Sequence, residues 1–274
     1  MDYDRAYAFF KANEKLLHRK DHQTINAIIE EISGIRNFFP TQESTSQAWQ
    51  NLKNAYPTQA STHKKEYGDF QTNYPLAKSI ADEAFRRCDP IAFVLEPTCG
   101  KGNFILACLH QQKPLQKIVG IDIHPSYVWE AKLNVLCYFL ANPTFPKPEI
   151  DLIQANAFTF DYTKLAQSTV HLRTLVIGNP PWVTNADLGA ITSKNLPKKS
   201  NIKNHKGIDA ITGKGNFDVG EYLSLSIIQK FQYHNGLFAF LLKSSVIRNI
   251  LYNQKKNHFK IGHPEQLTID AKRE

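Results

Sequence analysis

The sequence predicts an α/β fold in which a mostly parallel sheet is covered by helices on both faces. Two observations predict it. From about residue 90 onward, apolar runs of strand length alternate with helical stretches, and this alternation is typical of parallel sheets. Glycine, acidic and amide residues follow directly after several of these runs. Ligands of such sheets bind at the carboxyl ends of the strands, so we expect the functional residues there.

The individual elements follow from the apolar pattern. The predicted strands are Ile91–Pro97, Lys117–Ile123, Ile150–Ala155, Leu175–Gly178 and Leu237–Leu242. The predicted helices are Asn103–His110, Tyr127–Leu140, Tyr222–Phe231 and Val246–Phe259, and Gln266–Ile269 could form one more strand.

Residues 1–62 are predicted to form an N-terminal helical extension. Apolar side chains recur there at roughly helical spacing, for example at Ile25, Ile28, Ile29 and Ile32. The extension is either a helical layer packed on the main domain or an arm that binds a partner. Residues 63–274 are predicted to form the main domain.

Composition narrows the class of protein. The 274 residues carry a formal net charge of +8, which favours an anionic partner such as nucleic acid. The four cysteines show no C-x-x-C spacing, so we expect reduced thiols and no metal site. The acidic start of the chain lacks the apolar core of a signal peptide, and no apolar run reaches membrane-spanning length. We therefore expect a cytoplasmic protein.

Residues 183–216 are predicted to form a long basic loop. Lysines outnumber acidic residues there, and Ser, Asn, Thr and Gly fill the gaps. The loop either holds nucleic-acid phosphates or is an ordinary solvated surface loop.

A glycine turn follows the first predicted strand, in Glu96-Pro97-Thr98-Cys99-Gly100-Lys101-Gly102. Two glycines allow a tight turn and a close approach of the backbone to a ligand. The third glycine of a dinucleotide fingerprint is missing, and the Glu96 carboxylate would repel a pyrophosphate. A cationic ligand suits the turn better, and S-adenosylmethionine carries a sulfonium and an ammonium but no phosphate.

Asp122 lies at the tip of the second predicted strand. Its two carboxylate oxygens can accept hydrogen bonds from both hydroxyls of a ribose. The alternative is that Asp122 caps the helix that follows. Together with the glycine turn, its position favours the ribose.

The fourth predicted strand leads into Asn179-Pro180-Pro181-Trp182. Two prolines end a central strand and fix the backbone. The Asn179 side-chain oxygen and the Pro180 carbonyl can accept the two hydrogens of an aromatic amine, while Trp182 stacks on its ring. These bonds free the nitrogen lone pair for a methyl group, so orientation and electrostatics would do most of the catalytic work.

These motifs resemble a known family. Asn-Pro-Pro-aromatic downstream of Pro-x-Cys-Gly-x-Gly-x-Phe, with Lys65–Thr72 upstream, is similar to the amino-methyltransferases that modify N6 of adenine in DNA in restriction-modification systems. The order of motifs is that of the class with the cofactor region first. The resemblance covers roughly residues 63–250 and implies a Rossmann-like S-adenosylmethionine-dependent methyltransferase fold, with Asn179, Pro180, Pro181 and Trp182 as the catalytic element.

The resemblance also implies a cofactor site. Phe70 and Thr72 would hold the methionine end of the cofactor, Asp122 its ribose, and Ile123 its adenine. The remaining implied cofactor residues are Glu96, Pro97, Cys99, Gly100, Gly102, Asn156, Phe158 and Tyr222. Asn156 stands where the family usually has Asp, and Asn73 where it usually has Pro. Tyr222 has an alternative as part of a helix core.

Three alternatives remain open: an RNA amino-methyltransferase, a protein-glutamine methyltransferase, and a non-catalytic nucleic-acid-binding subunit or remnant. Little sequence follows Leu242, so we expect the domain to be incomplete at its C-terminus and to lack a target-recognition region. The chain alone should then bind DNA weakly and without sequence preference, and activity should need a separate recognition chain or a continuation of the domain.

Overall fold

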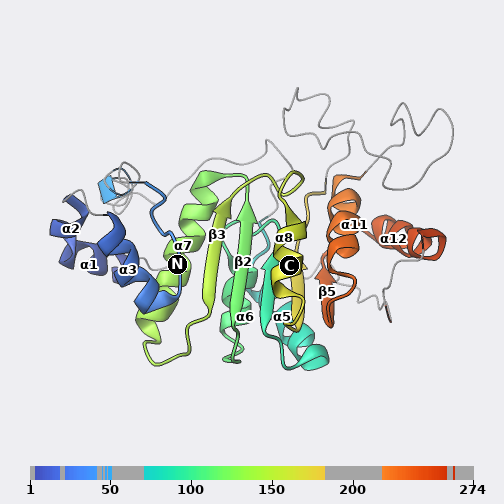
Figure 1. Ribbon diagram of the computed structural model, residues 1–274, viewed down its shortest axis with the longest axis horizontal. Coiled ribbons are helices and arrows are strands. Elements are labelled where there is room, and N and C mark those ends of the chain that lie inside the picture. Colours follow the sequence, from blue (N-terminus) through green and yellow to red (C-terminus); the bar gives the residue numbers. More distant parts are fainter. Residues whose placement is uncertain are drawn as a thin grey trace, which may run out of the picture.

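The computed structural model describes residues 4–18, 22–41, 71–182 and 218–257, and the single positions 45, 47, 49, 50 and 262. Within them, five parallel strands form one sheet (Figure 1). The strands are β1 (Phe93–Glu96), β2 (Lys117–Asp122), β3 (Glu149–Gln154), β4 (Thr174–Gly178) and β5 (Gly236–Phe240).

The strand order is β3-β2-β1-β4-β5. The chain runs outward from β1 to β3, returns to place β4 on the other side of β1, and then adds β5. The order therefore reverses between β1 and β4, and the carboxyl ends of these two strands flank the crevice where open α/β sheets bind ligands. The predicted fold class is confirmed.

Alternate residues of each strand point to opposite sides of the sheet. Both sides carry apolar side chains, and helices cover both faces. On one face, Val94, Ile118 and Ile177 belong to a core cluster with residues of three helices, α5 (Tyr74–Cys88), α6 (Asn103–Leu109) and α7 (Pro125–Ala141). On the other face, Leu95 and Val176 pack with α8 (Tyr162–Thr169) and α11 (Val219–Phe231).

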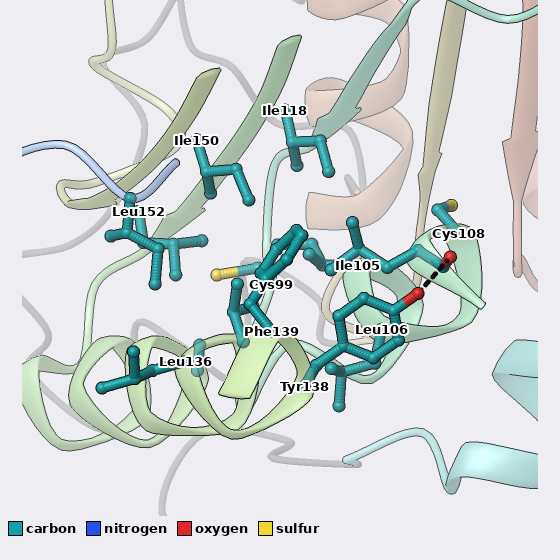
Figure 2. Close-up of a cluster of buried hydrophobic side chains, with 14 of the residues drawn as sticks. Cys99, Ile105, Leu106, Cys108, Ile118, Leu136, Tyr138, Phe139, Ile150 and Leu152 are labelled. Atoms are coloured by element: carbon teal, nitrogen blue, oxygen red, sulfur yellow. Dashed lines mark hydrogen bonds between the residues drawn. The ribbon is translucent and has the colours of Figure 1, made fainter. Parts of the chain in front are cut away.

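Figure 2 shows part of the first core cluster, between α6, α7 and the sheet. Ile105 and Phe139 are fully buried there, as is Ile150 of β3. Tyr138 is buried too, and its hydroxyl donates to the Leu109 carbonyl at 2.9 Å, which satisfies a polar group in an apolar setting. This packing fixes α6, and with it the glycine turn from which α6 begins.

Several predicted boundaries shift by a few residues. Strand β1 ends before Pro97, which has no N–H for the ladder, and β5 ends at Phe240. Helix α11 begins at Val219 because the Asp218 carboxylate accepts hydrogen bonds from the Gly220 and Glu221 N–H groups. The last helix, α12, spans Ser244–Asn257. The predicted strand 266–269 lies outside the described residues.

Helices α5 and α8 were not predicted from the sequence. In α5 the Asn73 side chain accepts from the Leu76 N–H at 2.9 Å, and Pro75 lies in the first turn, so the departure from the family's usual Pro at residue 73 supplies a helix cap. In α8 the Asp161 side chain accepts from the Thr163 N–H. Both helices begin at a capping side chain, which is the sequence signal that could have revealed them.

The N-terminal helices α1 (Asp4–Ala12), α2 (Glu14–His18) and α3 (His22–Ser33) lie beside α7 and the β3 edge of the sheet (Figure 1). Gly34, at φ 73°, ends α3, and the next residue, Ile35, forms a parallel bridge with Ile150 of β3. Helices α1 and α3 contact α7 and share its core cluster, as expected for a packed helical layer. Residues 34–41 are not helical, and the predicted boundary at 62/63 lies outside the described residues.

Lys132 of α7 is buried under this N-terminal layer. Its ammonium donates to the Asn37 carbonyl at 2.9 Å and to the Phe38 carbonyl at 2.8 Å, and it lies 5.8 Å from the centroid of the Phe38 ring. Burial lowers the pKa of Lys132 to about 8, although the charge of Asp151 opposes the shift. The layer is therefore attached to α7 through a cation that is costly to bury.

We expect the stability of the protein to depend on the protonation of Lys132. The unfolded chain binds this proton up to about pH 10.5, and the folded protein only up to about pH 8. Below pH 8 Lys132 is protonated in both the folded and the unfolded state, and burying its charge then costs most. The free energy of unfolding should therefore rise between about pH 8 and pH 10.5, by at most about 3 kcal/mol. The neutral amine keeps two N–H donors for the same two carbonyls.

Denaturant unfolding across this pH range tests the expectation. The difference in unfolding free energy between Lys132→Met and the wild type should change by up to about 3 kcal/mol over the window. Lys164→Met, at an exposed position of α8, is the control and should track the wild type. A difference between Lys132→Met and wild type that stays constant with pH would contradict the prediction.

No helix among the described residues is long and apolar enough to cross a membrane.

Candidate functional site

The glycine turn lies at the carboxyl end of β1 and holds a conformation that side chains disfavour. Gly100 and Gly102 have φ values of 49° and 82°, in the left-handed region that glycine adopts at little cost. A Cβ on Gly100 would also lie 2.4 Å from Oε1 of Gln71. The turn therefore favours glycine at residue 100 for its backbone angle, whereas the exposed Gln71 side chain could move aside for a Cβ.

Asp122, at the end of β2, holds this turn. Its Oδ2 accepts from the Gly100 N–H at 2.8 Å, and its Oδ1 accepts from the His124 N–H at 2.8 Å. The sequence left open whether Asp122 binds a ligand or caps the next helix. The structure shows a carboxylate that fixes the backbone on both sides, at the strand end where a ligand would lie. A carboxylate oxygen has two lone pairs and can accept more than one hydrogen bond.

Glu96, the last residue of β1, is a buried carboxylate beside the same crevice and is 2% exposed. Burial raises its pKa well above the ordinary value; a hydrogen bond from the Ile105 N–H opposes the shift, and the charge of Asp122 adds to it. Its Oε2 has no hydrogen-bond partner among the described residues. A buried acceptor of this kind normally has a partner, and a cationic or N–H-bearing ligand could supply one.

Cys99 is also buried, and burial raises the pKa of its thiol well above the ordinary value. The thiol is therefore neutral, and it packs against the sheet: a Cβ on Gly120 of β2 would lie 3.3 Å from the Cys99 Cβ. Pro97 is buried next to the start of the Asn-Pro-Pro-Trp element, since a Cβ on Gly178 would lie 3.6 Å from the Pro97 Cδ.

The Asn-Pro-Pro-Trp element follows β4 at the opposite side of the crevice. The Thr98 hydroxyl of the glycine turn donates to the Asn179 backbone carbonyl at 3.3 Å. The Asn179 side-chain Nδ2 donates to the Thr72 hydroxyl at 3.2 Å. Three segments that are far apart in the sequence thus meet at Asn179, which is hydrogen-bonded to both Thr72 and Thr98.

The Pro-Pro segment packs against the beginning of α11. A Cβ on Gly220 would lie 3.1 Å from the Pro181 carbonyl oxygen and 3.5 Å from the Pro180 Cβ. Trp182 is 37% exposed, and its indole N–H donates to the Leu241 carbonyl at 3.3 Å. The ring is therefore held at one edge and accessible to a stacking partner.

Lys243, just after β5, is a site residue that the sequence did not reveal. Its ammonium donates to the Trp182 carbonyl at 3.1 Å and lies 3.4 Å from Oδ2 of Asp218, the cap of α11. It therefore connects the end of the Asn-Pro-Pro-Trp element to the start of α11. Nothing in the local sequence around residue 243 indicates these contacts, because they come from three separate elements.

The remaining predicted residues lie after β2, after β3 and in α11. Ile123 follows Asp122 and is half-buried. Asn156 accepts from the Phe158 N–H at 2.9 Å, so part of its capacity already supports this loop. The Phe158 and Tyr222 rings lie 6.1 Å apart at 49°, and Tyr222 is half-buried on α11. Phe70 and the basic loop 183–216 lie outside the described residues.

Two known proteins with similar sequences are named type II methyltransferases. The type II methyltransferase M.NspV of Nostoc sp. is 36% identical over 210 residues, which are 77% of this chain and 42% of that protein. The type II methyltransferase M.VspI of Vibrio sp. is 21% identical over 237 residues, 86% of this chain and 49% of that protein. The chain is a homologue of type II methyltransferases. This homology implies S-adenosylmethionine as the cofactor.

This chain spans less than half the length of the two curated relatives that it matches. No protein-family model matches the chain. Among solved structures, the methyltransferase subunit of a type I restriction-modification system from Streptococcus thermophilus aligns with a TM-score of 0.46 at 15% identity, over 79% of this chain and 49% of that one. At that score the alignment supports no assignment of function.

Proposed function

We propose that the chain binds S-adenosylmethionine and transfers its methyl group to the exocyclic N6 amino group of adenine in DNA, as part of a restriction-modification system. The observation that carries the proposal is the placement of Asn179-Pro180-Pro181-Trp182 across the crevice from the glycine turn that Asp122 holds. The sequence homology to type II methyltransferases supports DNA as the substrate.

The cofactor half of the proposal rests on the chemistry of the crevice. The buried Glu96 carboxylate has an oxygen without a partner among the described residues, which suits the ammonium or sulfonium of S-adenosylmethionine and opposes a phosphate. Asp122 would accept from the ribose hydroxyls while it holds the turn. Phe158 and Tyr222, whose rings lie close together, would flank the cofactor's adenine with Ile123, and Asn156 would accept from its amino group.

S-adenosylmethionine, when bound, supplies the methyl group on a good leaving group, so the protein needs no strong base to activate it. The protein's own task is to orient the amine. The Asn179 side-chain oxygen and the Pro180 carbonyl would accept its two N–H bonds, which favours sp³ geometry at the nitrogen. Trp182 would stack on the base once the base is flipped out of the duplex.

Sequence recognition is a separate part of the proposal. The residues assigned above to the cofactor and the amine make no contact with the edges of neighbouring bases in this proposal, whereas reading a DNA sequence needs side chains that reach base edges. We propose that a recognition chain or additional polypeptide supplies these contacts. This chain alone would then methylate DNA weakly or without site preference.

The experiment is to incubate the purified chain with labelled S-adenosylmethionine and with unmethylated DNA, RNA or protein, at near-physiological salt. The modified residues are then mapped. We expect label on N6 of adenine in DNA. Label on N4 of cytosine would mean that the substrate base is cytosine and not adenine, while the proposed methyltransferase activity would stand. Label on RNA or on protein glutamine alone would overturn the DNA assignment, and calorimetry showing no S-adenosylmethionine binding would overturn the proposal altogether.

A further inference from the structure

Thr72 touches the Asn-Pro-Pro-Trp element directly, although residue 72 precedes it by 107 positions. Its hydroxyl accepts from the Asn179 side-chain Nδ2 at 3.2 Å. Its backbone carbonyl accepts in turn from the Asn103 side chain, at the start of α6, at 2.7 Å. The Thr72 main chain is therefore held by α6, while its side chain reaches the Asn179 amide.

We propose that Thr72 is a positioning residue that fixes the Asn179 side-chain amide for methyl transfer. The inference rests on the proposed function and deepens it, because it assigns to Thr72 a role in the transfer step beside the cofactor contact that the family resemblance implies. The role needs only the hydroxyl oxygen. It does not depend on which base carries the amine.

The physical reason lies in the asymmetry of an amide group. Asn χ2 is broad and roughly two-fold, so an unrestrained side chain can present either its oxygen or its NH2 group to a neighbour. Only the oxygen can accept an N–H bond from an amine, whereas the NH2 group would oppose donor to donor. With Nδ2 held at Thr72, the oxygen is the end of the amide that remains for the amine.

The rest of Asn179 is held independently, which isolates the contribution of Thr72. The Thr98 hydroxyl donates to the Asn179 backbone carbonyl at 3.3 Å, and Pro180 fixes the backbone that follows. Loss of the Thr72 hydroxyl should therefore leave the main chain in place and remove a restraint on the side-chain torsion. The effect should appear in the rate of transfer, where the bond to the amine strengthens, and less in binding.

The first arm of the test is spectroscopic and needs no activity. In protein labelled with ¹⁵N-asparagine, the Asn179 side-chain NH2 signals are identified by their loss in Asn179→Ala. In Thr72→Val, which keeps the shape but removes the hydroxyl, they should shift and exchange faster with solvent. They should stay in place in Thr72→Ser and in Thr163→Val, the same change at an exposed position of α8. Unchanged Asn179 signals in Thr72→Val would overturn the proposal.

The second arm is kinetic. At saturating S-adenosylmethionine and DNA, Thr72→Val should lower kcat about tenfold, since one neutral hydrogen bond is lost, and Thr72→Ser should restore most of it. If Thr72 only binds cofactor, Thr72→Val raises the KM for S-adenosylmethionine and leaves kcat at the wild-type value, which overturns the positioning role. If the wild type transfers no methyl group to any substrate, the proposed function fails, and the spectroscopic arm still decides whether Thr72 holds the amide.

Discussion

Asn179→Ala should reduce methyl transfer by about 100- to 1,000-fold, the usual cost of removing one preorganised group that acts on the transition state. The reason is that the Asn179 oxygen would bind the amine most strongly as the nitrogen becomes tetrahedral. Binding of S-adenosylmethionine should stay within about threefold of the wild type, because a contact made mainly in the transition state contributes little to ground-state binding. Single-turnover transfer and calorimetry measure the two quantities.

The matched control for this variant is Asn142→Ala. Asn142 follows α7 and donates from its side chain to the Tyr138 carbonyl, and it precedes β3, so it lies toward the amino ends of the strands and away from the crevice. The control should keep transfer near the wild-type rate. If Asn179→Ala also kept wild-type turnover on DNA, the Asn-Pro-Pro-Trp element would not be the amine site, and the proposed chemistry would have to be abandoned.

Asp122→Ala should weaken S-adenosylmethionine binding about tenfold to a hundredfold, which corresponds to the loss of charged hydrogen bonds of about 1.5–3 kcal/mol. The structure adds a second contribution. The substitution also removes the acceptor for the Gly100 N–H and the His124 N–H, so the glycine turn loses its support. Calorimetric titration with S-adenosylmethionine gives the affinity, and hydrogen exchange at the Gly100 amide reports the turn.

Two further variants separate these contributions. Asp122→Asn keeps one carbonyl oxygen as an acceptor, so its loss of affinity should be intermediate. Asp89→Ala removes an exposed carboxylate that pairs with Lys113 before β1, on the side of the sheet away from the crevice, and should leave cofactor affinity unchanged. Wild-type affinity for S-adenosylmethionine in Asp122→Ala would rule out the ribose contact. If the wild-type protein bound a dinucleotide and not S-adenosylmethionine, the cofactor assignment would be wrong.

The sequence revealed those features whose causes are local. Strand-length apolar runs that alternate with helical stretches predict a parallel sheet, because residues buried on both faces leave that pattern in any short window. The glycine turn was readable since only glycine adopts the left-handed angles at low cost, and the Asn-Pro-Pro-Trp element since two prolines must end a central strand. Helix α5 was missed, although Asn73 and Pro75 mark its beginning.

Only the tertiary structure decided how these pieces meet. The sequence does not state that β4 returns to the side of β1, and that strand order is what brings Thr72 and Asn179 into contact. Lys243 reaches Trp182 and Asp218 from a third element, and Lys132 is buried by an N-terminal layer about 94 residues away in sequence. Local sequence patterns indicate how each segment folds. Contacts between distant segments depend on packing energies summed over the whole core, and a short window of sequence does not contain that information.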